Sequence, residues 1–473
     1  MAQKHLRFKE IASYSLGLLG FQLIVGYLNS YQAEFYMTAM GADFAIIGVL
    51  LLVVKIVSAI FDPVVGNLID RTNGKRGKLK PFILYSLLPL LVTTIVIFIK
   101  IPLMGFWLYA YIFVTFLLFS MSMTLGDVPS QAIGSVATPD ATERTNLVSI
   151  ANTFRAVGLS AGSAVVPVVC MIIAGGSRVL VKKGETDSPI SVEEYLVSAI
   201  VIAVLGCALF SLIYFVNKER IPYKPEKMTL KDMKNTLKNN RPFLLVIISC
   251  FLGFGRQIQT SIAIQASNAV MGSQNLGLLL GLTGGIGAVI SMAIVPLLIK
   301  KSDEKKVYIG LSVYGFVISL ITFFVGYKSL PLMLVFLFFN GFQFGVVNIF
   351  PVIMSADSVD YYEYKTGKRA EGTIYAVLSL TVKITIAMGT ALGMFILRIA
   401  NYDAAAATQG DTPTIIYFAY TVVPGLFGLL SIIPIFKYDL FGKNKLKIAD
   451  ELQRRRAEAE NLGRSETTPA MPS

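Results

Sequence analysis

The sequence predicts an all-α, polytopic membrane protein with about twelve transmembrane helices in two six-helix halves. The 473 residues are 54% hydrophobic and only 15% charged, whereas a soluble domain carries about 25% charged residues. Apolar segments of about 20 residues, the length that crosses a bilayer, recur along the whole chain. A single long basic connection at residues 218–240 divides these segments into two equal groups.

The apolar segments can be placed in order, and their connections predict the topology. The start, MAQKHLRFKE, is charged and has no small-residue cleavage pattern, so we expect a retained cytoplasmic N-terminus. Basic connections fall on alternate sides of the spans, and the positive-inside bias therefore puts both termini in the cytoplasm. We expect spans at about 11–38, 44–70, 82–101, 106–136, 147–175, 194–216, 242–271, 275–300, 307–326, 331–356, 372–400 and 414–437.

These spans define four parts of the chain. We expect six-helix halves at residues 1–216 and 242–437, a cytoplasmic linker at 217–241 and a cytoplasmic tail at 438–473. The linker is expected to form a short amphipathic helix on the membrane surface, and the tail to be disordered at its end. Two such halves around a central site are the architecture of the major facilitator superfamily.

Composition excludes several classes of function. The net charge of +13 comes from short basic runs between apolar segments, which fits cytoplasmic loops and not a nucleic-acid surface. The three cysteines lie in apolar segments without metal spacing, and the single histidine, His5, lies in the N-terminal tail. No nucleophile–base pair, metal cluster or phosphate-cradling motif is present, so we expect neither an enzyme nor a cofactor. The run GLTGGIGAVI lies within a span and is interpreted as small residues for close helix packing.

Charged residues in the second span form the first candidate site, because a charge inside a span is expensive. Lys55, Ser58 and Asp62 follow at i, i+3 and i+7 and share one helical face. Asp62 precedes Pro63, where a kink would free carbonyl oxygens to join the carboxylate around a cation. The alternative is an intrahelical ion pair between Lys55 and Asp62.

The fourth and eleventh spans carry further charges. Thr124 and Asp127 share a face, so two helices each offer a carboxylate and a hydroxyl, which are ligands for sodium or groups that carry a proton. The alternative for Asp127 is a structural role at the kink of Pro129. Lys383, in LSLTVKITIAMG, is the expected countercharge for Asp62 or Asp127, the alternative being a lysine that reaches an interface.

The roles of four other charged residues stay open. Arg155 and Arg256 lie in predicted spans, and the sequence does not decide between pairing with a substrate and packing near a boundary. Glu34 and Arg398 lie near predicted outer ends, where snorkelling or pairing at a gate is expected.

Two loop motifs resemble those of a known family. FDPVVGNLIDRTNGKRGKLKP and DSVDYYEYKTGKRAEG are similar to loop signatures of the glycoside–pentoside–hexuronide:cation symporters, the group that contains melibiose permease. GDVPSQ in the fourth span and the lysine of TVKI in the eleventh occur where family members carry similar residues. The resemblance covers residues 14–437 and implies secondary active transport of a glycoside with sodium, lithium or a proton.

The resemblance also implies roles for individual residues. Asp62 matches the family's cation aspartate, and Thr124 matches a threonine of the cation site. Asp127 matches an aspartate that recognises sugar, and Lys383 matches the lysine that interacts with the charged site.

The chain departs from the family pattern at several positions. Ser58 stands where melibiose permease has a second acidic residue of the cation site, which favours coupling to a proton over sodium. Gln22 replaces a sugar-binding aspartate, Gln131 a tryptophan and Asn152 an arginine, and Arg155 follows one turn later. With Arg155 and Arg256 nearby, these changes hint at an anionic substrate such as a hexuronide or another organic acid.

The leading expectation is therefore a monomeric importer that works by alternating access on a small molecule and a coupling cation within the lipid bilayer. Alternatives are a transporter of an amphipathic or steroid-like substrate, uniport or efflux, and a membrane receptor or scaffold that does not transport. The loop RTNGKRGK is expected to act as a cytoplasmic gate. The gate residues are Asp70, Arg71, Lys75, Arg76, Lys78, Asp357, Asp360, Glu363 and Arg369.

Overall fold

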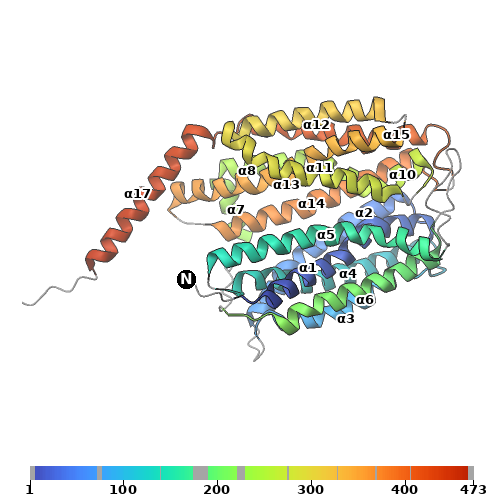
Figure 1. Cartoon of the computed structure of the whole chain (residues 1–473), viewed down its shortest axis with the longest axis horizontal. Coiled ribbons are helices and arrows are strands. Elements are labelled where there is room, and N and C mark those ends of the chain that lie inside the picture. The colour runs from blue at the N-terminus through green and yellow to red at the C-terminus, as the bar shows by residue number, and fades with distance from the viewer. Residues whose placement is uncertain are drawn as a thin grey trace, which may run out of the picture.

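A computed structural model describes most of the chain, and every regular element in the described part is a helix. The helices lie side by side along the long axis of the molecule, and the C-terminal helix projects from one end (Figure 1). We call the end where the first helix begins, at Phe8, the proximal end, and the end where it stops, at Thr38, the distal end. The described residues are 6–71, 77–138, 140–173, 190–220, 230–273, 276–326, 329–367, 370–404 and 406–466.

The first half of the chain forms the lower part of the bundle in Figure 1. The first helix packs against the fifth and the sixth, the second against the fourth, and the third against the fourth and the sixth. The six helices are α1 (Phe8–Thr38), α2 (Phe44–Arg71), α3 (Lys80–Ile97), α4 (Gly105–Val136), α5 (Ala141–Ile173) and α6 (Val192–Val216).

The second half forms the upper part, and α2 packs against its helix α14 at the seam between the halves. Its elements are α8 (Arg241–Leu252), the 3-10 helix η1 (Phe254–Gln257), α9 (Ile258–Ser261), α10 (Ala263–Met271), α11 (Gly277–Lys301), α12 (Glu304–Gly326), α13 (Leu330–Thr366), α14 (Glu371–Ile399), α15 (Thr412–Leu430) and α16 (Ile432–Ile435). Before it, α7 (Leu230–Asn239) confirms the helix predicted in the linker, and after it α17 (Gly442–Glu466) forms much of the tail.

The twelve predicted spans all coincide with helices. Ten helices of the described part are long and apolar enough to cross a membrane, and the pair Arg241–Leu252 and Phe254–Ser261, bent by 47°, makes an eleventh span. The remaining predicted span lies on α2, whose segment Phe44–Ser58 is apolar but shorter. The chain is therefore a multi-pass membrane protein with the helix order that the sequence predicts.

Glycines allow close contact within the second half, as interpreted for the run at residues 281–290. A Cβ atom added at Gly341 would lie 2.1 Å from the carbonyl oxygen of Gly284, and one added at Gly287 would lie 2.0 Å from that of Phe338. Both contacts join α11 to α13, whose backbones approach more closely than side chains would permit. The run is therefore a packing surface and not a phosphate-binding loop.

Candidate functional site

An ion pair inside the first half is the centre of the candidate site. Asp127 on α4 and Arg155 on α5 are joined by an Nη2–Oδ1 distance of 3.3 Å. Gln131, one turn after Asp127, donates from Nε2 to the other carboxylate oxygen at 2.8 Å. The side chains of Arg155 and Asp127 are 22% and 20% exposed, so both remain accessible to a ligand.

Helix α1 supplies the third wall of this cluster. The hydroxyl of Tyr14 donates to the carbonyl oxygen of Ser130 at 3.0 Å and fixes α1 against α4 close to Asp127. Gln22 lies two turns further along α1, and its buried Oε1 accepts no hydrogen bond from the described residues. Asn152 lies one turn before Arg155 on α5 and is exposed. The structure thus brings Asp127, Gln131 and Arg155 into direct contact and leaves polar groups of Gln22 and Asn152 available.

A cavity of about 350 Å³ lies between the two halves, distal to this cluster. On α5 it begins at Leu159, one turn beyond Arg155, and on α1 it begins at Gly26, one turn beyond Gln22. Its volume falls in the range of about 300–1,000 Å³ that is typical of small-molecule sites. Its polar lining is neutral and consists of amides and hydroxyls, among them those of Asn29, Ser160, Ser163, Gln259, Thr260 and Tyr420.

This cavity lies between the halves, where a central site was predicted, but its lining residues are not among those predicted. Its walls come from both halves, and small residues such as Gly281 and Gly285 on α11 open towards space instead of packing. The glycine-rich run was a visible signal, but its interpretation as packing accounts only for the glycines that face α13.

The expected cation residues lie at or near the seam between α2 and α14. Lys55 lies over the ring of Phe116 at 5.6 Å and is close enough to Lys383 for the two ammonium groups to interact. Ser58 is half-buried on α2, and Thr124 is buried on α4. Asp62 belongs to α2, but its side chain lies outside the described part of the structure. The predicted ion pair of Lys55 with Asp62 therefore stays a prediction.

The structure shows an ion-pair partner for Asp127, one of the two carboxylates predicted to pair with Lys383. Asp127 obtains its cation from Arg155 in its own half. Lys383 lies on α14, which packs against α2. The predicted pairing of Lys383 with Asp62 or Asp127 stays a prediction.

Two polar contacts join the halves at the distal end. The carboxylate of Glu34 on α1 is fully buried and accepts a hydrogen bond from the amide of Gln265 on α10. Asp43, before α2, pairs with Arg398 near the end of α14 at 3.2 Å. Between snorkelling and pairing at a gate, the structure favours pairing for both Glu34 and Arg398.

At the proximal end, the loop between α2 and α3 is bound by the segment that follows α6. The carboxylate of Glu219 accepts hydrogen bonds from the backbone N–H groups of Lys78, Leu79 and Lys80 at 2.9–3.0 Å. Next to it, Arg220 contacts the carboxylate of Glu10 on α1 at 2.8 Å. Glu219 was not predicted from the sequence. Leu79, the residue before α3, has no capping side chain, and the carboxylate of Glu219 binds the first N–H groups instead.

Removing the carboxylate of Glu219 should destabilise the start of α3. We expect Glu219→Ala to destabilise the start of α3 by about 1–2 kcal/mol, the usual value of a helix cap. The measurement is hydrogen exchange of the amides at 78–80, whose protection should fall by about tenfold for each 1.4 kcal/mol. Glu219→Gln keeps one acceptor oxygen and should lose less protection, and equal protection in all three proteins would contradict this role.

One predicted gate residue of the second half, Asp357, binds the tail. Lys445 on α17 contacts Glu304 at 2.5 Å and Asp357 at 2.8 Å. Burial lowers the pKa of Lys445, but its hydrogen bonds to Asp357 and Glu304 outweigh burial and raise the pKa above its usual value. Lys445 therefore keeps its charge at neutral pH and fastens α17 to α12 and α13.

The other predicted gate residues are only partly placed. Asp360 and Glu363 are half-buried on α13, beyond Asp357. The side chains of Asp70 and Arg71, and the whole of Lys75, Arg76 and Arg369, lie outside the described part.

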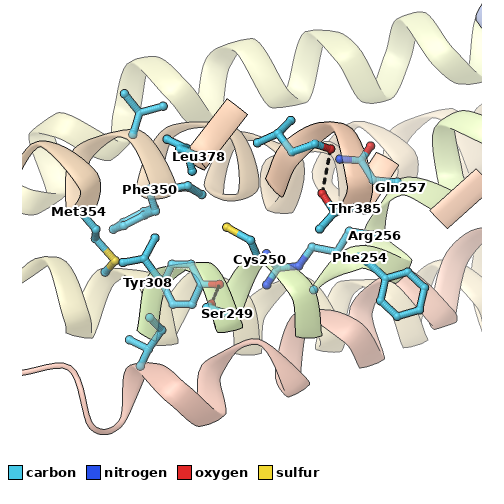
Figure 2. A pocket seen from close by; sticks show the side chains of 16 residues that line it. Ser249, Cys250, Phe254, Arg256, Gln257, Tyr308, Phe350, Met354, Leu378 and Thr385 are labelled. Atoms are coloured by element: carbon cyan, nitrogen blue, oxygen red, sulfur yellow. Dashed lines mark hydrogen bonds between the residues drawn. The ribbon is translucent and has the colours of Figure 1, made fainter. Parts of the chain in front are cut away.

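Arg256 does not join the other candidate residues. It lies in η1 within the second half and is 4% exposed. Its Nη2 donates to the carbonyl oxygen of Gly428 at 3.0 Å and to the hydroxyl of Ser431. Figure 2 shows its guanidinium group beside Cys250, in a pocket enclosed by helices of that half.

Comparisons with known proteins agree with this architecture. The profile of one protein family, described as MFS/sugar transport protein, matches residues 13–441. The inner membrane symporter YicJ of Escherichia coli is 26% identical over 459 residues, which are 95% of this chain and 96% of the relative. A glucuronide carrier protein homolog of E. coli is 27% identical over 474 residues, with 97% and 98% of the chains covered.

A solved structure supports the same fold. The nucleoside transporter NupG superposes with a TM-score of 0.63 at 14% sequence identity, covering 92% of this chain and 100% of the other. At this identity the likeness concerns the arrangement of the helices alone.

Proposed function

The chain belongs to the MFS/sugar transport protein family, and from this membership we propose that it imports a sugar-type solute by cation-coupled symport. The observation that carries the proposal is the cluster of Asp127, Gln131 and Arg155 next to a neutral polar cavity between the halves. Hydroxyl groups of a sugar can accept hydrogen bonds from a guanidinium and an amide and donate them to a carboxylate. The cluster offers all three groups.

The coupling cation we propose is a proton, taken up by Asp62. Ser58 leaves the α2 face with one carboxylate fewer than the family's sodium sites, which weakens the attraction for a metal cation. Lys383 would report to the second half whether the proton is bound.

The substrate class we propose is a glycoside or hexuronide. The cavity volume suits a sugar, and its amide and hydroxyl lining suits a polyol. Arg155 would meet the carboxylate of a hexuronide only by sharing or releasing Asp127, whereas a neutral glycoside leaves the ion pair intact. Apolar residues such as Leu159, Ile264 and Leu280 also line the cavity, so an amphipathic or steroid-like substrate is the second candidate.

Alternating access would use the contacts at the two ends. Buried Glu34 and Gln265 join the halves at the distal end, and we propose that this end faces outward and is closed here. The loop bound by Glu219 would then belong to the cytoplasmic gate, with both termini in the cytoplasm. We further propose that the chain is neither an enzyme nor a nucleic-acid-binding protein, and that it acts as a monomer.

The choice of cation can be tested in proteoliposomes that contain the purified protein. We expect an imposed pH gradient to drive uptake of a glycoside or hexuronide, and a sodium gradient at fixed pH to change the rate by less than about twofold, as expected for a site with one carboxylate fewer. Ser58→Asp restores the missing carboxylate and should gain sodium stimulation. Strong sodium stimulation of the wild type would refute proton coupling, and uptake of amphipaths alone would favour the second substrate class.

A further inference from the structure

Arg256 is a buried cation whose hydrogen-bond acceptors are all neutral. Besides Gly428 and Ser431, its Nη2 donates to the Oγ atom of Ser312 at 3.5 Å. The described part of the structure gives Arg256 no ion pair, and its Nε–H has no acceptor. This differs from Arg155, which is paired with a carboxylate and is more exposed.

Such an arrangement is unfavourable unless something else supplies negative charge. Burying a guanidinium group away from water is costly without a counter-ion, and an unsatisfied N–H adds to this cost. Inside a membrane bundle, charged side chains are normally paired or face a water-filled cavity. Arg256 has no ion pair among the described residues and lines a pocket of its own.

The pocket has the size and lining of a site for a small anion. Its volume is about 70 Å³, several times the roughly 10–15 Å³ that one water requires and far below the roughly 300 Å³ of a typical ligand site. Among the sixteen residues that line it, Arg256 alone is charged, and Gln257 adds an amide (Figure 2).

The hydroxyls of Ser249 and Thr385 already donate to backbone carbonyl oxygens and offer no proton to a ligand. Ser249 donates to the carbonyl oxygen of Ser431 at 2.7 Å, and Thr385 donates to that of Val382 at 3.0 Å. The donors left for a ligand are therefore the guanidinium of Arg256 and the amide of Gln257. Both favour an anion over a cation or an apolar group.

We propose that this pocket binds a small monovalent anion, either a halide or a single carboxylate group, held by Arg256. The site lies within the second half, apart from Asp127 and Arg155. The anion could be free in solution or could be the carboxylate of a transported uronide. In the second case the inference rests on the proposed function and specifies its substrate.

The test is binding to the full-length protein in detergent. The unfolding midpoint is followed by circular dichroism in a buffer with isethionate as a bulky reference anion, during titration with chloride, formate or glucuronate. Arg256→Lys keeps the charge but loses the forked donor geometry and should weaken binding by about tenfold. Cys250→Leu leaves residue 256 unchanged but fills the pocket beside its guanidinium group, and it should abolish the rise of the midpoint. Arg398→Gln removes an exposed arginine and serves as the control.

Each outcome decides the proposal. A saturable rise of the midpoint with chloride or formate, retained in Arg398→Gln and lost in Cys250→Leu, supports a site for a free anion. The same pattern with glucuronate alone supports a site for the substrate carboxylate. The proposal would be overturned if no anion raised the midpoint. It would also be overturned if the rise in Arg256→Lys and Cys250→Leu equalled that of the wild type. Anion binding is measured here without transport. A negative result therefore does not bear on the symport proposal, which the uptake assay in proteoliposomes tests separately.

Discussion

Asp62→Asn should abolish the accumulation of substrate against its gradient. A membrane potential of about 100 mV is worth about 2.3 kcal/mol for each proton carried, enough for roughly fiftyfold accumulation of a neutral solute. An asparagine cannot take up the proton, so the accumulation ratio should fall to about one, the value of an uncoupled carrier. The measurement is the steady-state uptake of labelled substrate into proteoliposomes under an imposed potential and pH gradient.

Exchange of substrate between the two sides provides the internal control. Counterflow needs no net movement of the cation, so Asp62→Asn should retain it and thereby show that the protein folds and binds. Asp411→Asn removes an exposed carboxylate before α15 and should accumulate substrate like the wild type. Full accumulation in Asp62→Asn would place proton coupling on another residue.

Hydropathy predicted where the chain crosses the membrane but not where its helices end. The tenth span was expected to stop near residue 356, whereas α13 continues to Thr366. A helix ends where its backbone loses hydrogen-bond partners and not where the membrane ends. The tail helix α17 was missed for a related reason, because its composition is charged throughout and hydropathy gives it no signal.

The candidate site was predictable in its residues but not in its pairings. Asp127 and Arg155 stood out as charges within spans, yet the face of α5 that turns towards α4 depends on how the two helices pack. The same uncertainty applied to Arg256, which turned out to lie in a separate pocket. The contact of Glu219 had an indirect signal, because Leu79 before α3 offers no capping side chain and leaves its first N–H groups unsatisfied.

The two halves use the segment after their last span in a comparable way. Glu219 follows α6 and binds the start of α3, and Lys445 follows α16 and binds Glu304 at the start of α12. In both cases an ionised side chain from the exit segment holds the beginning of the third span of its half. The charges are opposite, because Glu219 accepts from N–H groups and Lys445 donates to carboxylates.

The ion pair of Asp127 and Arg155 should be essential for transport. We expect Asp127→Asn and Arg155→Gln each to lower kcat/KM for uptake by about a hundredfold, the lower end of the cost of breaking a desolvated charge pair. If the two side chains act as one unit, the double variant should be little worse than either single variant. The measurement is the initial rate of uptake over a range of substrate concentrations at matched expression. It gives kcat/KM of each of the three variants relative to the wild type.

The chain offers a matched control for this prediction. Asp43 and Arg398 form an ion pair of the same residue types at nearly the same distance, 3.2 Å, but their side chains are 35% and 55% exposed. Exposed pairs contribute only about 0–1 kcal/mol, so Asp43→Asn and Arg398→Gln should change kcat/KM by less than about fivefold. Equal losses of kcat/KM at both ion pairs would show that the pair of Asp127 and Arg155 has no special role in transport. A large loss at Asp127 and Arg155 alone would place the substrate beside them, since Arg155 lies one helical turn from Leu159 in the lining of the cavity between the halves.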